Sequence, residues 1–445
     1  MSYIFPKNLY TDVRIEHLFS TEIRYTLGEL NECKVRQYSA AFIRVYDGDR
    51  WYYASTSNLD AIQTEIDALS ELATENDTLE ETQIFQNFST EKGEKLVFTE
   101  HKVSDVPLED KISLLQSIMP LMEESAYVKF WTLLYVDEYK VKEFYNSKGA
   151  QLSWDFQRAG FFALFQMAEG DRQMQEYFQL GKTRFDELKD YESTLTALLE
   201  ECAQFMSESE AVEPGAYTVI LSPTVAGFFA HECFGHKSES DFMMGDEATK
   251  AEWFLGKRVG FDDLSIIDSG QELGSGYVPF DDEGNVATKT YLVKNGILTG
   301  RLHSAASAAD LGEAVTGNAR AINYEYEPLV RMTTTAIDNG TSSFEQLISE
   351  LEDGVYVKGI MHGSGMSTFT LAPTRAYYIK DGKIGKPVRI SVISDNVFES
   401  LGKIDGIAND VEVSASLAGC GKGDQFPLPV GHDGPHIRIR DMQVQ

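Results

Sequence analysis

Residues 217–241, YTVILSPTVAGFFAHECFGHKSESD, join a short apolar strand pattern to a short helical pattern. Ser222 is a residue type that caps helices, and Pro223 suits the first helical position, where its missing N–H needs no partner. The apolar residues that follow predict a buried helix face: Val225, Phe228 and Phe229. The unit therefore predicts a packed strand and helix whose last turn carries a glutamate between two histidines: His231, Glu232 and His236.

The two histidines are five positions apart, whereas helix-borne zinc ligands are usually four apart. In a regular α-helix, positions i and i+4 differ by about 40° around the axis, but positions i and i+5 differ by about 140°. His231 and His236 can share one ion only if the helix changes near its end. Two changes would suffice: Gly235 in a left-handed conformation, or a π-bulge with its wider turn. The alternative is a buried helix end with two hydrogen-bonded histidines.

A catalytic zinc ion usually takes three protein ligands, so a third ligand must come from elsewhere in the chain. Cys420, in LAGCGKGDQ, is the favoured candidate, because flanking glycines allow close approach and a thiolate binds zinc well. Cys233 lies between the two histidines and is a residue type that more often packs than coordinates. Many carboxylates and several histidines stay open as alternatives: His303, His362, His432 and His436.

With Zn²⁺ on His231, His236 and Cys420, the adjacent Glu232 is placed to take a proton from a zinc-activated water molecule. It could then pass that proton to a leaving amine, as peptide-bond hydrolysis requires. A structural zinc site is the alternative, but it would need a fourth protein ligand and would give Glu232 no task.

The chain before residue 214 predicts an N-terminal α/β region, 1–213, with a possible division into 1–105 and 106–213. Alternating residues at 21–55, with a turn at Asp47 and Gly48, indicate a small antiparallel sheet. Amphipathic patterns predict helices at 59–73, 111–124 and 186–207. Pro214 and Gly215 break the pattern and place the main domain boundary.

Residues 214–445 are rich in glycine and turn signals. Hairpin turns are predicted at 282–285, at Asn295 with Gly296 and at Asp381 with Gly382. This domain should therefore contain a large, mainly antiparallel sheet that carries the metal-site helix. The whole chain is predicted to be α+β.

The bulk properties narrow the classes of partner. The 445 residues carry a net charge of −31, which disfavours nucleic acid as a partner. The apolar runs are too short to cross a membrane, and the first residues do not resemble a signal peptide, so a cytoplasmic location and no membrane partner are expected. The four cysteines have no spacing typical of a disulfide framework.

Four further residues are candidates for substrate contacts. Asp282 in FDDEG could orient a peptide, although such residues commonly form a hairpin turn. Arg320 in TGNARA could bind a substrate carboxylate or an oxyanion, or form an ordinary ion pair. His432 and His436 in VGHDGPHIR could support the metal site, or could be loop histidines.

Several motifs resemble the TldD/PmbA family of metalloproteases, in particular its metal-bearing, TldD-like branch. HECFGH is similar to the His-Glu-x-x-x-His motif of that branch, and CGKGDQ resembles its cysteine segment. FDDEG, LVKNGILTGRLHS, TGNARA, AYYIKDGKIGKPVR and DGDRWYYAST add to the similarity. The resemblance implies a peptidase for unfolded or flexible peptides, zinc on His231, His236 and Cys420, and Glu232 as catalytic base. It also implies a dimer, formed with a second copy or with a related subunit.

Two alternatives to a zinc peptidase stay open. The first is a non-catalytic subunit that binds peptides or a partner with the same fold, although such a subunit would not need the complete set of four site residues. The second is a zinc hydrolase that cuts a non-peptide amide with those same residues.

Overall fold

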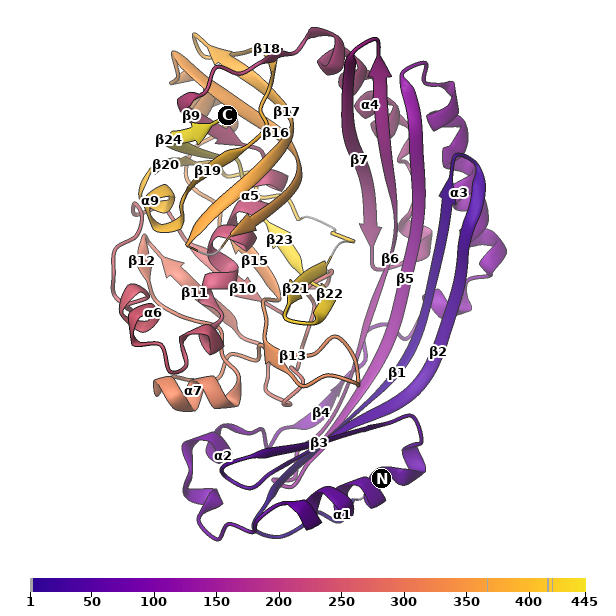
Figure 1. The fold of residues 1–445 in the computed structure, drawn as a ribbon, viewed down its shortest axis with the longest axis vertical. Helices are drawn as coiled ribbons and strands as arrows, with labels where there is room; N and C mark the ends of the chain where they lie inside the picture. Colours follow the sequence, from indigo (N-terminus) through magenta and orange to yellow (C-terminus); the bar gives the residue numbers. More distant parts are fainter. Residues whose placement is uncertain (1–2, 366, 414–415, 418) are drawn as a thin grey trace.

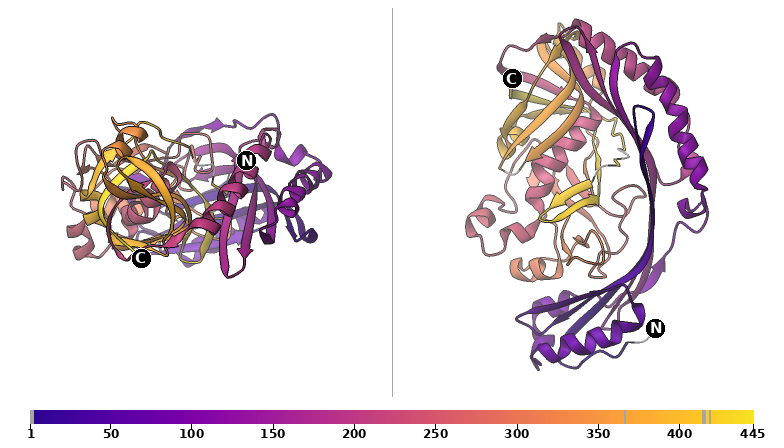
Figure 2. Two further views of the ribbon diagram at one scale, coloured as in Figure 1. Left: turned by 90° about the horizontal axis from the view of Figure 1, so that it is seen from above. Right: turned by 45° about the vertical axis from the view of Figure 1, so that its right-hand side comes forward.

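A computed structural model describes residues 3–365, 367–413, 416–417 and 419–445. The first half of the chain forms a long, curved and mainly antiparallel sheet, and the second half packs against the concave side of that sheet (Figures 1 and 2). The mixture of helices and sheets agrees with the predicted α+β class. None of the helices in the described part of the chain has the length and apolar character that crossing a bilayer requires.

The N-terminal sheet has seven strands, in the order β3-β2-β1-β5-β6-β4, with β7 paired to β6. Its strands are β1 (Tyr10–Thr26), β2 (Glu29–Tyr46), β3 (Trp51–Thr56), β4 (Lys92–Lys95), β5 (Val128–Asn146), β6 (Gln151–Glu169) and β7 (Arg172–Lys182). The helices of this half are α1 (Ile62–Leu72), α2 (Gln83–Asn87), α3 (Leu108–Glu124) and α4 (Glu192–Glu208). Short 3₁₀ turns connect them: η1 (Leu59–Ala61), η2 (Leu79–Glu81), η3 (Val103–Asp105) and η4 (Phe185–Glu187).

The N-terminal half is expected to contain small separate sheets, but its strands form one large sheet. The hairpin at Asp47 and Gly48 is confirmed, but β1 begins at Tyr10, well before the alternating pattern. Its first seven residues are all buried, charged ones included, so burial does not alternate there even though residues 12–16 alternate polar and apolar in the sequence. The predicted helix at 186–207 begins only at Glu192, because residues 185–187 form a separate 3₁₀ turn.

Helices cover the convex side of this sheet. Figure 2 shows α3 and α4 along one part of it and α1 at the opposite end. Apolar side chains of α3 and α4, such as Leu115 and Leu195, join those of β5 and β6, such as Leu133 and Phe161, in one buried cluster. A second cluster joins α1 to β1 and β2. Burying these faces stabilises the long strands and leaves their concave side for the second half of the chain.

The second half contains two main sheets. One has eight strands, in the order β16-β9-β24-β19-β17-β18-β8, with β20 on β24, and the other has five, in the order β12-β11-β10-β15-β23. The strands are β8 (Glu210–Ala211), β9 (Gly215–Leu221), β10 (Ile266–Ser269), β11 (Lys289–Lys294), β12 (Ile297–Leu298), β13 (Ala319–Arg320), β14 (Leu329–Val330), β15 (Thr334–Ile337), β16 (Asp353–Gly365), β17 (Thr368–Lys380), β18 (Lys383–Arg389), β19 (Ile393–Asn396), β20 (Ile404–Ile407), β21 (Gly419–Lys422), β22 (Gln425–Pro429), β23 (Gly431–Asp433) and β24 (Ile437–Val444).

Short helical elements connect the strands of this half. They are α5 (Pro223–Phe229), the π-helix η5 (Ala230–Gly235), η6 (His236–Ser238), η7 (Ser240–Met243), α6 (Glu247–Glu252), α7 (Ala305–Leu311), α8 (Phe344–Ser349) and α9 (Val397–Gly402). Most strand pairs are antiparallel, as expected, although β16–β9, β18–β8 and β15–β23 are parallel. The turns at residues 295–296 and 381–382 connect hairpins, whereas the predicted hairpin at 282–285 is a turn closed by a single bridge, Phe280 to Val286.

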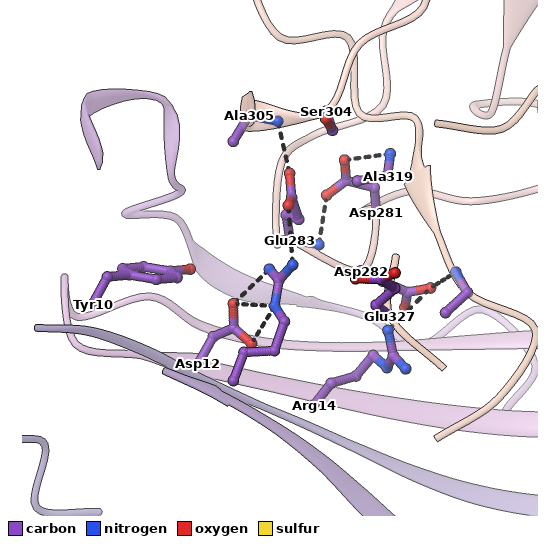
Figure 3. Close-up of polar contacts among 12 residues, drawn as sticks. Tyr10, Asp12, Arg14, Asp281, Asp282, Glu283, Ser304, Ala305, Ala319 and Glu327 are labelled. Carbon is purple, nitrogen blue, oxygen red and sulfur yellow. Dashed lines mark hydrogen bonds and ion pairs between the residues drawn. The ribbon is translucent and has the colours of Figure 1, made fainter. Parts of the chain in front are cut away.

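The two halves meet through buried charges (Figure 3). Arg44 on β2 binds Asp12 on β1 at 2.6 Å and Glu283 at 3.2 Å. Glu283 also accepts a hydrogen bond from the Ala305 backbone N–H at 2.7 Å, and Lys142 on β5 binds Asp282 at 2.5 Å. The acidic turn at residues 281–283 therefore anchors the C-terminal half to the N-terminal sheet. The predicted domain boundary at residue 213 lies between β8 and β9. It stays a prediction. β8, on its N-terminal side, pairs with β18 of the second half.

Candidate metal centre

The strand and helix that carry the site follow the sequence pattern closely. β9 runs directly into α5, and the Ser222 hydroxyl accepts a hydrogen bond from the Val225 backbone N–H at 3.4 Å. Pro223 occupies the first turn, and Val225 and Phe229 are fully buried. The capped, buried helix holds the residues after it in a defined position.

Beyond Phe229 the α-helix widens into the π-helix η5, Ala230–Gly235. The wider turn brings His231 and His236 to one side, with their ring centroids 5.1 Å apart. The left-handed alternative for Gly235 is wrong, since its φ of −58° and ψ of −52° are right-handed. This glycine instead makes room for a neighbour: a Cβ at this position would lie 2.0 Å from the Met332 Sδ.

Cys420 reaches the two histidines from β21. Its Sγ lies 3.4 Å from the His236 Nε2, and one ligand atom from each of the three residues falls within 4.8 Å of the others. Tetrahedral zinc ligands lie about 3.3–3.8 Å apart, so this donor set suits a zinc ion. Among the described residues, the buried Nδ1 of His231 has no hydrogen-bond partner, which is an expensive state for a polar atom that a bound ion would relieve.

The site has unusual electrostatics. Burial, aided by His236 and His432, lowers the pKa of His231 well below its usual value and keeps the ring neutral, as a ligand must be. Burial alone would lower the pKa of His236, but its contacts with Cys420 and with the Glu239 carboxylate raise that pKa to about 10. A metal ion bound by His236 would have to displace the proton that this raised pKa favours.

Glu232 lies beside the three ligands. Its Oε2 is 4.0 Å from the His236 Nε2, and its side chain is 19% exposed. Burial raises the pKa of the Glu232 carboxyl, and His236 offsets only part of this rise. A strand passes very close, because a Cβ on Gly363 would lie 3.0 Å from the Glu232 Cγ. Glu232 is therefore held in place, partly desolvated, and a suitable proton acceptor.

Comparison with known proteins agrees with the motifs. A family model described as the PmbA/TldA metallopeptidase C-terminal domain matches residues 214–445, more than half of the chain. The chain belongs to the TldD/PmbA family. A second model, PmbA/TldA metallopeptidase domain 1, matches residues 11–76.

The relatives of this family member carry metalloprotease names. A metalloprotease of Synechocystis sp. is 41% identical over 235 residues, which are 52% of this chain and 50% of that protein. A metalloprotease of Methanothermobacter thermautotrophicus is 29% identical over 98% of this chain and 95% of its own length. A zinc metalloprotease TldD homolog of Saccharolobus solfataricus is 30% identical over 71% of each chain.

The fold is also that of a solved structure. TldE from Thermococcus kodakarensis matches with a TM-score of 0.77 and 15% sequence identity, over 98% of this chain and 96% of that one. At this identity the likeness concerns the fold alone.

Two residues that the motif analysis missed, Glu239 and Lys422, lie beside the candidate ligands. Glu239 is fully buried, with its Oε2 3.6 Å from the His236 Nδ1 and 3.0 Å from the Lys422 Nζ. The carboxylate can hold the His236 ring so that its other nitrogen faces the metal position, as carboxylates commonly do for zinc-bound histidines. The sequence could have pointed to both residues through their spacing, since Glu239 follows His236 by three residues and Lys422 follows Cys420 by two.

The two histidines predicted to support the metal site, His432 and His436, lie in different places. His432 is near the ligands, with its ring 6.2 Å from that of His231, and burial lowers its pKa to about 4. His436 is engaged elsewhere: its Nδ1 lies 2.8 Å from Asp410, and its Nε2 lies 3.2 Å from the Tyr356 hydroxyl. We therefore keep only His432 as a neighbour of the metal centre.

Asp282 and Arg320 lie at the contact between the two halves of the chain. Burial alone would raise the pKa of Asp282, but Lys142 and Arg14 lower it to about 2. Arg320 is 5% exposed and donates to the backbone carbonyls of Met332 and Pro429. Both residues line a small cavity beside the β21–β22 hairpin.

A serine, a histidine and a glutamate also form a chain of side-chain contacts like that of a hydrolase triad. The Ser240 hydroxyl is 3.0 Å from the His303 Nδ1, and the His303 Nε2 is 3.0 Å from Glu313. Ser240 is fully buried and donates to the Leu302 carbonyl at 2.5 Å. A nucleophile must reach its substrate, so this cluster is structural.

Replacing Gly235 by alanine should loosen the metal centre. The added methyl group would overlap the buried Met332 side chain, and the π-turn that positions His236 would have to shift. We expect a loss of about 1–3 kcal/mol in the free energy of unfolding, measured with urea, and weaker zinc binding in a chelator competition.

The double variant Gly235→Ala with Met332→Ala tests the cause. If the clash is responsible, the two changes should be coupled by about 0.5–3 kcal/mol, because removing the Met332 side chain frees the space that the new methyl group needs. Additive effects would contradict this explanation.

Proposed function

We propose that the protein is a zinc-dependent peptidase that hydrolyses unfolded or flexible peptides. His231, His236 and Cys420 would hold the zinc ion, and Glu232 would act as the general base. The observation that carries the proposal is the π-turn, which brings two histidines five residues apart to the thiol of Cys420 with Glu232 beside them.

Zinc is the metal that this donor set favours. Two imidazoles and one thiolate form a borderline-soft set, and three protein ligands leave one position for water or substrate. The name of the Saccharolobus relative adds independent support for zinc. A bound zinc ion would supply Lewis acidity, which eases deprotonation of a water molecule and polarises the substrate carbonyl.

The remaining chemistry belongs to side chains of this chain. The Glu232 carboxylate accepts the proton of the attacking water molecule and returns it to the amine that leaves when the peptide bond breaks. Glu239 and Lys422 hold the His236 ring, which keeps its Nε2 directed at Cys420. Because Glu232 must be ionised to act as a base, hydrolysis should weaken as the pH falls through its raised pKa.

We also propose that the protein pairs with a second copy or with a related subunit, and that it works in the cytoplasm. A large apolar side chain is exposed on the hairpin that carries Cys420. Phe426, on the same hairpin as Cys420, is 66% exposed and could be covered by a partner or by a peptide.

Removal of the metal tests the proposal. The purified protein, treated with a chelator and dialysed, should lose hydrolysis of a fluorogenic peptide library and recover it with about one equivalent of Zn²⁺. A protein that takes up no zinc and cuts no peptide would contradict the proposal and favour a non-catalytic binding subunit. Zinc uptake with hydrolysis of non-peptide amides only would favour a different amide hydrolase.

A further inference from the structure

A small cavity lies where β5 and β6 of the N-terminal sheet meet the C-terminal half. Its volume is about 50 Å³. One water molecule needs about 10–15 Å³, so the cavity has room for roughly three or four water molecules or for one carboxylate group. Trp154, Phe156 and Phe280 form its apolar walls, and Arg320 contributes a guanidinium group. Its size and lining suit a small charged group with an apolar neighbour.

Arg320 is a buried cation without a carboxylate partner. Within the described ranges, no Asp or Glu oxygen lies within 4.0 Å of its guanidinium, which donates only to the carbonyls of Met332 and Pro429. Burial and the nearby Arg331 lower the pKa of Arg320 to about 10. The absence of a nearby carboxylate in the described part of the chain and the lowered pKa both indicate that the Arg320 charge is poorly compensated, which is costly in a buried position.

The carboxylates that line the cavity are already paired. Asp282 binds Lys142 at 2.5 Å. It also lies 3.7 Å from Arg14, and both of these residues are labelled in Figure 3. Glu138 binds Lys140 at 2.9 Å. The lining therefore has three cations and two carboxylates, and Arg320 is the cation left over. A positive cavity in a chain of net charge −31 is selective for an anion.

The cavity is next to the metal centre. Leu428 and Pro429 form part of its wall, and Leu428 lies directly opposite Cys420 on the β21–β22 hairpin. Paired residues on neighbouring strands have Cα atoms about 4.5–5.5 Å apart. A bound peptide that places an anionic group in the cavity would therefore need only a few residues to reach the three candidate ligands.

We propose that this cavity is a subsite for the C-terminal carboxylate of a peptide substrate, held by charge-assisted hydrogen bonds from Arg320. The inference rests on the proposed peptidase function and names its substrate class as short peptides with a free C-terminus. The aromatic walls would contact the side chain of the terminal residue.

Binding of matched peptides tests the subsite. The zinc-loaded Glu232→Gln protein, which should not hydrolyse them, is titrated with penta-alanine as the free acid and as the C-terminal amide, by calorimetry. We expect the acid to bind about 10–100-fold more tightly, because the amide lacks the charged partner for Arg320. Equal affinities would overturn the proposal.

The Arg320→Met and Arg320→Lys variants isolate the charge. Loss of the bonds to Met332 and Pro429 would weaken both peptides alike, so the ratio of acid to amide affinity reports the carboxylate contact only. The ratio should approach one in Arg320→Met and be partly kept in Arg320→Lys. A ratio unchanged in Arg320→Met would contradict the assignment.

Inorganic phosphate is the third probe. Arg320-dependent binding of phosphate, without any preference for the acid peptide, would replace the proposed subsite by a small-anion site. Absence of hydrolysis by the wild-type protein would count against the peptidase function alone, because the binding comparison uses an inactive variant.

Discussion

Replacement of Glu232 by glutamine is expected to reduce peptide hydrolysis by about 10²–10⁴-fold, the usual contribution of a general base. Glutamine has nearly the same shape, but its amide cannot accept the proton of the attacking water molecule. The side chain lies 4.0 Å from His236 and is not one of the three grouped ligands, so the zinc content should stay near that of the wild type. Hydrolysis of a fluorogenic peptide and elemental mass spectrometry measure the two quantities on one preparation.

The Glu232→Asp variant is the matched control. It keeps the charge but withdraws the carboxylate by one methylene group, so it should retain part of the activity that Glu232→Gln loses. If Glu232→Gln cuts peptides at the wild-type rate, Glu232 is not the base. If it loses both activity and zinc, Glu232 belongs to the metal ligands instead.

Replacement of Cys420 by alanine is expected to remove the metal and, with it, all peptide hydrolysis. Cys420 supplies the only thiol in the group, and its Sγ lies 3.4 Å from the His236 Nε2. Loss of a group that merely supports a ligand typically costs 10–100-fold in metal affinity, so loss of a ligand should cost more than about 100-fold. Zinc per chain, measured after dialysis against a competing chelator, checks this result.

Cys233→Ala is the matched control for this change. Cys233 is also buried, and it lies within the π-turn between the two histidines, but it is not one of the grouped ligands. This variant should keep about the wild-type zinc content. Binding of Co²⁺ gives a second test, because the absorption band of a cobalt–thiolate bond should disappear in Cys420→Ala and persist in Cys233→Ala. The opposite pattern would exchange the roles of the two cysteines.

The local parts of the fold could be predicted because their signals depend on near neighbours. Ser222 and Pro223 begin α5 as expected, and Asn295 and Asp381 begin the turns of two hairpins. The length of the N-terminal sheet could not be predicted in the same way. Residues 12–16 alternate polar and apolar side chains, but the charged ones are buried, two of them in ion pairs, and a short local pattern reveals neither that burial nor the full length of the strand.

The sequence by itself determined the residue types of the site, the turn and cap positions and the need for a non-α turn between His231 and His236. Only the tertiary structure decided between a left-handed Gly235 and a π-helix, and it packs Met332, far along the chain, against Gly235. It also decided that Cys420 meets His236, that Glu239 and Lys422 support them, and that Arg320 lacks an acidic partner among the described residues. Capping and turn preferences act within a few residues, whereas packing and charge pairing depend on segments that folding brings together.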